Sequence, residues 1–161
     1  MVQVIRGERC HVVLDVQHFP LLFTKFVGDV TVEMFAEYFD WVVQINQRAQ
    51  AEGTKIVTVT DGTQGSRPSA DARAYIAAKQ DEIVDAYGHL SLASYVALDS
   101  ALVRGALTAI GWVAKRGLAV TPVRSIAEGV ERALADFDAA GVPRPTSLPS
   151  TDYRFPKVDS P

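Results

Sequence analysis

The residues best suited to chemistry lie in one short polar stretch near the middle of the chain. It follows the apolar segment 55–60 and precedes a segment of helical spacing that begins at Ser69. The loop at the carboxyl end of a central strand is where open α/β sheets usually place their sites. We therefore predict a partner- or ligand-binding site made of five residues, Asp61, Thr63, Ser66, Arg67 and Ser69.

Small polar residues and backbone N–H groups in this stretch could hold an anion. Residues 62–66 (Gly-Thr-Gln-Gly-Ser) lead into a helix start, and Arg67 adds a positive charge. The stretch lacks the lysine of a P-loop and the glycine spacing of a dinucleotide fingerprint. A specific phosphate site and an ordinary flexible connection both stay open, and the incomplete motif favours the connection.

The same stretch contains half of a known catalytic signature. Residues 61–63 (Asp-Gly-Thr) match the second half of the haloacid dehalogenase pattern Asp-x-Asp-Gly-Thr. That pattern needs a nucleophilic aspartate at position 59, where Val59 cannot form an aspartyl intermediate. The three histidines lack ligand spacing, and Cys10 is the one cysteine. The sequence therefore predicts a protein that is not an enzyme, with no metal site and no cofactor.

The composition of the whole chain is that of an ordinary globular protein. Its 161 residues are 48% hydrophobic and 22% charged, which suits one domain with a real core. A net charge of −3 argues against a dedicated nucleic-acid binder. The chain shows neither a signal-peptide pattern nor an apolar run of about 18 residues. With its single cysteine, this predicts a cytoplasmic protein without a membrane span.

The elements before the polar stretch should form one side of a sheet. Apolar segments at 10–16 and 21–27 predict two strands joined as an antiparallel hairpin. A helix should run from a Thr31 cap to a stop at Gly53. Its inner face is predicted by apolar residues at three- and four-residue spacing: Phe35, Tyr38, Val42, Ile45 and Ala49. The segment 55–60 is then the central strand.

The second half of the chain repeats strand and helix. Ser125 and Glu128 have the spacing of a capping box. The order β-β-α-β-α-β-α-β-α predicts an α/β fold with a mixed, mostly parallel sheet of about five strands. The expected elements are helices at 69–88, 100–116 and 125–141 and strands at 92–98 and 119–123.

The helix expected at 100–116 is apolar almost all round. Residues 101–114 contain one charge, so this helix should be buried on more than one side. It is either the central helix of its layer, or one of its faces meets another chain, such as a second copy in a homodimer. In the second case the apolar interface would include Arg104, Leu107 and Trp112.

The last twenty residues differ from the rest. Five of the eight prolines lie in 142–161, and no apolar periodicity continues there. We predict a single domain over 1–141 and a proline-rich mobile tail over 142–161. Tyr153 and Phe155 could anchor that tail onto the domain or onto a partner.

Over residues 10–140 the chain resembles the STAS superfamily, and within it the SpoIIAA-like branch. The resemblance is diffuse and rests on three segments: Phe26-Val27-Gly28-Asp29 before the first helix, 56–61 as the central strand, and Ser125-Ile126-Ala127-Glu128 opening the last helix. It implies a strand-helix fold with helices mainly on one face of the sheet, and no enzyme activity. It also implies regulation by docking to protein partners, while related folds bind lipids or nucleotides.

The chain departs from this family at the phosphorylation switch of the anti-sigma-factor antagonists. Their motif at the second helix start is Asp-Ser-Ser/Thr-Gly, and the matching positions here read Ser69-Ala70-Asp71-Ala72. Phosphoregulation is therefore not carried over to this chain. What the resemblance leaves is a binding surface around residues 62–69.

Three functions follow from these observations. The first is a non-enzymatic cytoplasmic regulatory domain that acts through protein contacts. The second is a small-ligand or lipid-binding module of the same fold, and the third is an enzyme of unrecognised type, which the missing acid/base pairs disfavour. A closed apolar pocket above about 300 Å³ would favour the ligand-binding module, whereas a flat apolar patch would favour protein contacts.

Overall fold

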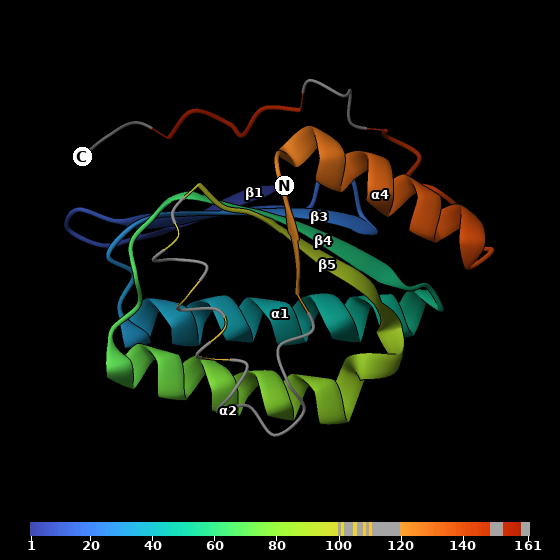
Figure 1. The fold of residues 1–161 in the computed structure, drawn as a ribbon. Helices are drawn as coiled ribbons and strands as arrows, with labels where there is room; N and C mark the ends of the chain where they lie inside the picture. The colour runs from blue at the N-terminus through green and yellow to red at the C-terminus, as the bar shows by residue number, and fades with distance from the viewer. Residues whose placement is uncertain are drawn as a thin grey trace.

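The computed structural model describes residues 1–99, 101, 105, 108, 110, 120–148 and 153–158. A six-stranded mixed sheet has helices on both faces (Figure 1). Its strands are β1 (Val2–Arg6), β2 (His11–Asp15), β3 (Leu21–Gly28), β4 (Ile56–Gly65), β5 (Ser91–Ala97) and β6 (Thr121–Val123). The helices described from end to end are α1 (Val32–Glu52), α2 (Ala70–Tyr87) and α4 (Ile126–Ala139), and a short 3-10 turn, η1 (Gly88–Leu90), follows α2. The predicted mixed α/β fold is confirmed.

The strands lie in the sheet in chain order, from β1 to β6. The first three pair antiparallel, and β3, β4, β5 and β6 pair parallel. The prediction of about five strands missed β1, which pairs along its whole length with β2, from Val2 opposite Asp15 to Arg6 opposite His11. Its Val-Gln-Val-Ile-Arg sequence has only partial alternation, so its pairing depends on the β2 edge beside it.

Strand β4 is longer than its apolar sequence predicted. The sequence places its end at residue 60, but the strand continues to Gly65 because β3 runs beside it that far. Val27 pairs with Gln64 and Gly28 with Gly65, after a shift of register. The loop expected over residues 62–69 is therefore reduced to the four residues from Ser66 to Ser69.

Strand alternation assigns one face of the sheet to α1 and α2 and the other to α4 (Figure 1). Leu22 and Ile56 pack with α1, whereas Phe23, Val57 and Val59 pack with α4. The α1 ends are those predicted: the Thr31 side chain accepts from Met34 N–H, and Gly53 ends the helix in the left-handed conformation, at φ 63°. Helix α2 starts as predicted from a Ser69 cap.

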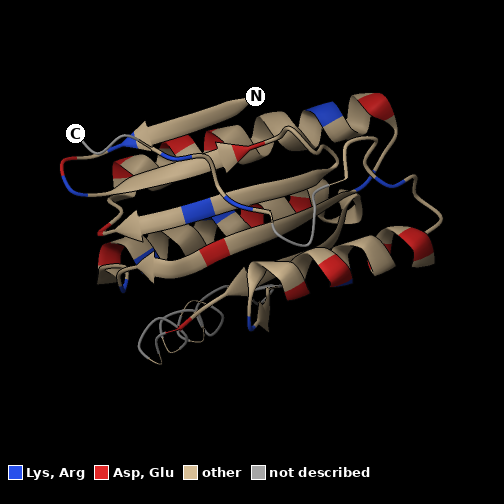
Figure 2. Cartoon of the chain, turned by 90° about the horizontal axis from the view of Figure 1, so that it is seen from above, with Lys and Arg blue, Asp and Glu red and all other residues tan. Residues whose placement is uncertain are grey.

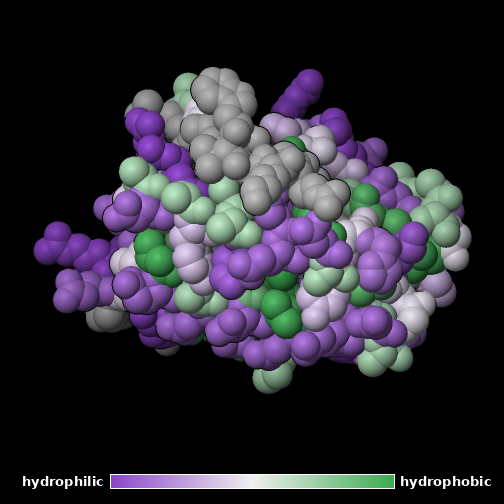
Figure 3. Space-filling model, turned by 90° about the horizontal axis from the view of Figure 1, so that it is seen from below, coloured by the Kyte–Doolittle hydropathy of each residue, from purple (hydrophilic) through white to green (hydrophobic). Residues whose placement is uncertain are grey.

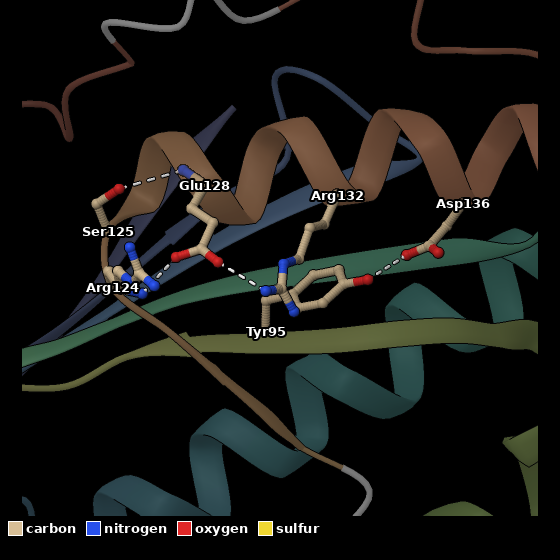
Figure 4. A network of polar contacts seen from close by, with 6 residues as sticks. All are labelled: Tyr95, Arg124, Ser125, Glu128, Arg132 and Asp136. Carbon is tan, nitrogen blue, oxygen red and sulfur yellow. Dashed lines mark hydrogen bonds and ion pairs between the residues drawn. The ribbon is translucent and has the colours of Figure 1, made fainter.

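Helix α4 is fixed to the sheet by close packing and by a polar network (Figure 4). The Ser125 hydroxyl accepts from Glu128 N–H at 3.2 Å, as a capping box requires. The Glu128 carboxylate, however, accepts from the N–H of Arg124, one residue before the cap, at 2.8 Å. Further along the helix, the Tyr95 hydroxyl donates to Asp136 at 2.6 Å and so ties β5 to α4.

The described part of the C-terminal segment crosses the α4 side of the sheet (Figure 1). The Tyr153 ring stacks on Phe23, and Phe155 meets both rings edge-on. Earlier in the segment, the Ser147 carbonyl lies 2.6 Å from His18 Nδ1. The two aromatic residues thus contact the domain, as anchors of the segment would. Its mobility stays a prediction.

Candidate functional site

A cavity of about 500 Å³ lies between the sheet and the helices α1 and α2. The strands β3, β4 and β5 form its floor, the first half of α1 forms one wall and α2 another. A third side is formed by Leu98, Ile110 and Val120. The floor and the two helical walls are lined by Phe26, Thr60, Gly62, Ser94, Val96, Phe35, Tyr38, Phe39, Ile76 and Gln80.

The floor of the cavity carries hydroxyl groups because of strand alternation. Val57 and Val59 of β4 face α4, so Thr60 faces the cavity. Ser94 of β5 faces it in the same way. The Thr60 hydroxyl lies 2.8 Å from the hydroxyl of Thr24, a fully buried neighbour on β3. The floor is therefore polar in the middle of an otherwise apolar layer.

The α1 wall is aromatic. The Phe26 ring packs on Phe35 and Tyr38, with centroids 5.8 and 5.2 Å apart, and Tyr38 packs on Phe39 at 5.2 Å. Burial raises the pKa of Tyr38 to about 12, so its phenol stays a neutral donor at any physiological pH. Among the described residues, no hydrogen-bond partner is found for the Tyr38 hydroxyl. It could therefore donate to a group inside the cavity.

The rim of the cavity is the four-residue loop between β4 and α2. Ser66 N–H donates to the Gly28 carbonyl at 3.1 Å and fastens the loop to the end of β3. At its other end the Ser69 hydroxyl accepts from Ala72 N–H at 3.1 Å. The Arg73 guanidinium donates to the Pro68 carbonyl at 2.8 Å. The loop is thus held at both ends, and Ser66, Arg67 and Ser69 are exposed.

The predicted site residues separate into two groups. Ser66, Arg67 and Ser69 line the mouth of the cavity. Asp61 lies on the α4 side of the sheet, where its carboxylate is 3.3 Å from Lys25 Nζ. The other oxygen of that carboxylate accepts from the N–H and the hydroxyl of Thr63, at 3.0 and 2.6 Å. The sheet therefore separates Asp61 and Thr63 from the three predicted residues at the mouth of the cavity.

The separation has a physical cause in the length of β4. The sequence treats residues after position 60 as a loop, in which neighbouring side chains can converge. In a strand they alternate between faces, so Thr60 and Asp61 must point to opposite sides.

Seen from above, most of the sheet is uncharged, and acidic and basic residues are concentrated on helices and connections (Figure 2).

The predicted apolar interface residues Arg104, Leu107 and Trp112 lie outside the described residues. From the same segment, Ile110 is described, is 1% exposed, and lines the cavity. Figure 3 shows the face of the molecule opposite α4. Outside the grey atoms, its hydrophobic residues form separate small areas among hydrophilic ones.

Sequence reasoning missed the cavity residues on the central strands and on α2. Thr60 and Ser94 are hydroxyl residues at inward positions of two neighbouring strands, and Gln80 lies midway along α2. These polar residues at inward-facing positions could have indicated a cavity, because polar side chains in a core need a hydrogen-bond partner or a solvated space. Tyr38 was predicted on the inner, apolar face of the first helix, and its position on the cavity wall gave no separate signal.

The described part of the chain has neither a cluster of metal-ligating residues nor a membrane-spanning helix. No three or more residues among its histidines, cysteines, aspartates and glutamates lie close enough together to hold a metal ion. Within the same residues, no helix has the length and apolar character needed to cross a membrane.

Comparisons with known proteins give a likeness in fold alone. No family model matches the chain, and none of the curated proteins matches it. Among solved structures, a match is an uncharacterized protein of the DUF3478 family with a SpoIIAA-like fold, from Shewanella loihica PV-4. It is 16% identical, the match covers 83% of this chain and 92% of that one, and the TM-score is 0.46.

Proposed function

We propose that this chain is a non-enzymatic binding domain that holds a small, largely apolar molecule between its sheet and the helices α1 and α2. The observation that supports this proposal is the cavity of about 500 Å³. Small-molecule sites usually have volumes of roughly 300–1,000 Å³ and an apolar lining with a few polar groups. Packed interiors otherwise keep few voids larger than a water molecule.

The lining of the cavity fits such a ligand. Phe35, Phe39 and Ile76 offer apolar contact on two walls, while Thr60 and Ser94 offer hydroxyl groups on the floor. A ligand with an apolar body would gain about 25 cal/mol for each Å² of apolar area removed from water. The floor hydroxyls would fix its orientation through hydrogen bonds.

Filling the cavity tests the proposal. Ser94→Phe places a large ring on the cavity floor, whereas Ser91→Phe makes the same change at an exposed position of the same strand. Nile red, a neutral dye that fluoresces in apolar sites, should bind the unmodified protein saturably. Its affinity should fall about tenfold or more in Ser94→Phe and stay within about twofold in Ser91→Phe.

The outcome that contradicts the proposal is equal dye affinity in both variants and the unmodified protein. Melting curves of both variants are needed beside the titrations, because a phenylalanine on β5 can also disturb packing. A Ser94→Phe protein that melts cooperatively and still loses the dye supports the cavity as the site.

Regulation through protein contacts is a second candidate function at the same rim. The feature that favours it is the exposure of Ser66, Arg67 and Ser69 on a loop held at both ends. A cytoplasmic partner protein could bind this loop, with an affinity that depends on whether a ligand fills the cavity. The double variant Arg67→Ala/Ser69→Ala should weaken such a complex, with a stability loss of about 1 kcal/mol from the lost helix cap. Full partner binding by that variant would contradict this candidate.

A further inference from the structure

We infer that the ligand of this cavity carries an anionic group at one end, which Arg67 holds at the mouth while the apolar body lies inside. This inference rests on the proposed function and adds the chemical class of the ligand, an apolar carboxylate or phosphate. Its starting point is the charge inventory of the lining. Among the described residues that line the cavity, two are charged, Asp29 and Arg67, and both lie at the mouth.

Arg67 differs from the other charged side chains near it. Lys25 and Asp61 pair with each other on the far face of the sheet, and Arg73 donates to the Pro68 carbonyl. Arg67 forms neither a hydrogen bond nor an ion pair with any described residue. A guanidinium presents paired N–H donors whose geometry matches a carboxylate or a phosphate. An anionic ligand group would give this side chain the partner it lacks.

The loop that carries Arg67 is held in place rather than left free. The hydrogen bonds of Ser66 to Gly28 and of Ser69 to Ala72 fix it on both sides of Arg67. Fixing the loop in advance reduces the entropy that ligand binding would otherwise cost. The first turn of α2 follows directly, and the positive end of its helix dipole favours negative charge at the same end of the cavity, although Asp71 already lies in that turn.

A second polar group of the cavity is independent of this rim. The Tyr38 hydroxyl, on the α1 wall, is a neutral donor without a partner among the described residues. An acceptor oxygen on the ligand would satisfy it. An apolar molecule with oxygen atoms at its charged end, or along its body, therefore fits the lining better than a pure hydrocarbon.

Asp29 determines which way the charged end lies. It is exposed and lines the mouth from the α1 side, where it would repel an anion. The anionic group is therefore expected on the α2 side, at Arg67. Removing the Asp29 charge should strengthen anion binding, whereas removing the Arg67 charge should weaken it. Asp29 and Arg67 should thus change anion affinity in opposite directions, although both lie at the mouth of the cavity.

The test uses cis-parinaric acid, a fluorescent apolar carboxylate, and its uncharged methyl ester. The unmodified protein should bind the acid about tenfold or more tightly than the ester. Arg67→Gln should remove that advantage and leave the ester affinity within about twofold, and Asp29→Asn should increase the advantage. Arg124→Gln is the matched control, because Arg124 is exposed beside α4 on the other face of the sheet.

Competition identifies the anionic group. Dodecanoate and dodecyl phosphate are each used to displace bound parinaric acid, and the stronger competitor indicates a carboxylate or a phosphate end. Equal affinity for acid and ester, unchanged in Arg67→Gln, would overturn the anionic end but leave a ligand-binding cavity. Absence of saturable binding by either probe and by Nile red would overturn both this inference and the proposed function.

Discussion

The ring of Tyr153 lies flat on the ring of Phe23, with centroids 3.7 Å apart and planes 12° from parallel. The hydroxyl of the same tyrosine donates to Asp15 at 2.7 Å. Phe23 is fully buried and Asp15 is 1% exposed. The C-terminal segment therefore covers a part of the sheet face beside α4. It packs against β2 and β3, which lie near the other end of the chain.

Truncation after Gly141 should destabilise the domain. The sequence alone predicts a mobile tail, whose loss would cost little stability, but the contacts of Tyr153 with Phe23 and Asp15 favour the opposite result. Exposing an aromatic side chain costs about 1.5–3 kcal/mol, and each kcal/mol shifts the melting temperature of a domain this size by roughly 2–4 °C. Calorimetry should show a fall of several degrees.

Two single variants separate this effect from the loss of chain length. Tyr153→Ala should reproduce most of the fall, and Arg154→Ala should have little effect, because Arg154 is exposed. If truncation left the melting temperature unchanged, the segment would be the mobile tail that its composition predicts.

Stability should decrease at alkaline pH through buried tyrosines. Burial, together with the hydrogen bond to Asp136, raises the pKa of Tyr95 to about 12. The unfolded tyrosine ionises near pH 10. Since the folded pKa is the higher one, its contribution is fully present below about pH 10 and is lost as the pH rises through about 12. Denaturant titrations across this range should show a shallower decrease for Tyr95→Phe, and an unchanged slope would contradict the assignment.

Gly129→Ala should destabilise the packing of α4 on the sheet. An added methyl group at Gly129 would meet Val59 Cγ1 at 2.8 Å, so that one of the two elements must move. Overpacking costs about 1–3 kcal/mol, which exceeds the gain of up to about 1 kcal/mol in helix propensity. Gly105→Ala is the matched control, because Gly105 is also helical and none of the described residues lies within 4 Å of an added methyl group. A more stable Gly129→Ala protein would show that the contact between α4 and β4 at Gly129 and Val59 is not tightly packed.

Local signals predicted most of the fold. The Thr31, Ser69 and Ser125 caps are where the sequence places them, since each depends on residues within one helical turn. The extent of β4 depends instead on β3, a distant segment that pairs with Asp61, Gln64 and Gly65, although aspartate and glycine have poor strand propensity. The strand β1 was missed for the same reason, because its partner on β2 stabilises it.

The candidate site was predicted less completely than the fold. The rim residues Ser66, Arg67 and Ser69 were identified because polar loops at strand ends have a recognisable composition. The cavity itself depends on how α1, α2, Ile110 and Val120 meet over the sheet. Such distances between elements have no local signature in a sequence.

Asp61→Asn should leave ligand binding unchanged, although the sequence groups Asp61 with the rim. Its carboxylate lies on the α4 face with Lys25 and Thr63, so the sheet separates it from the cavity. Asparagine keeps the acceptor oxygen for Thr63 and removes the charge that pairs with Lys25. The two side chains are only 21% and 12% exposed, so leaving Lys25 without its partner costs more than losing a surface pair, up to roughly 3–5 kcal/mol, and the melting temperature should fall by several degrees or more. Nile red and parinaric acid should bind within about twofold of the unmodified protein, in contrast to Arg67→Gln. A loss of binding of about tenfold in a stable Asp61→Asn protein would place Asp61 in the site and contradict the face assigned to it.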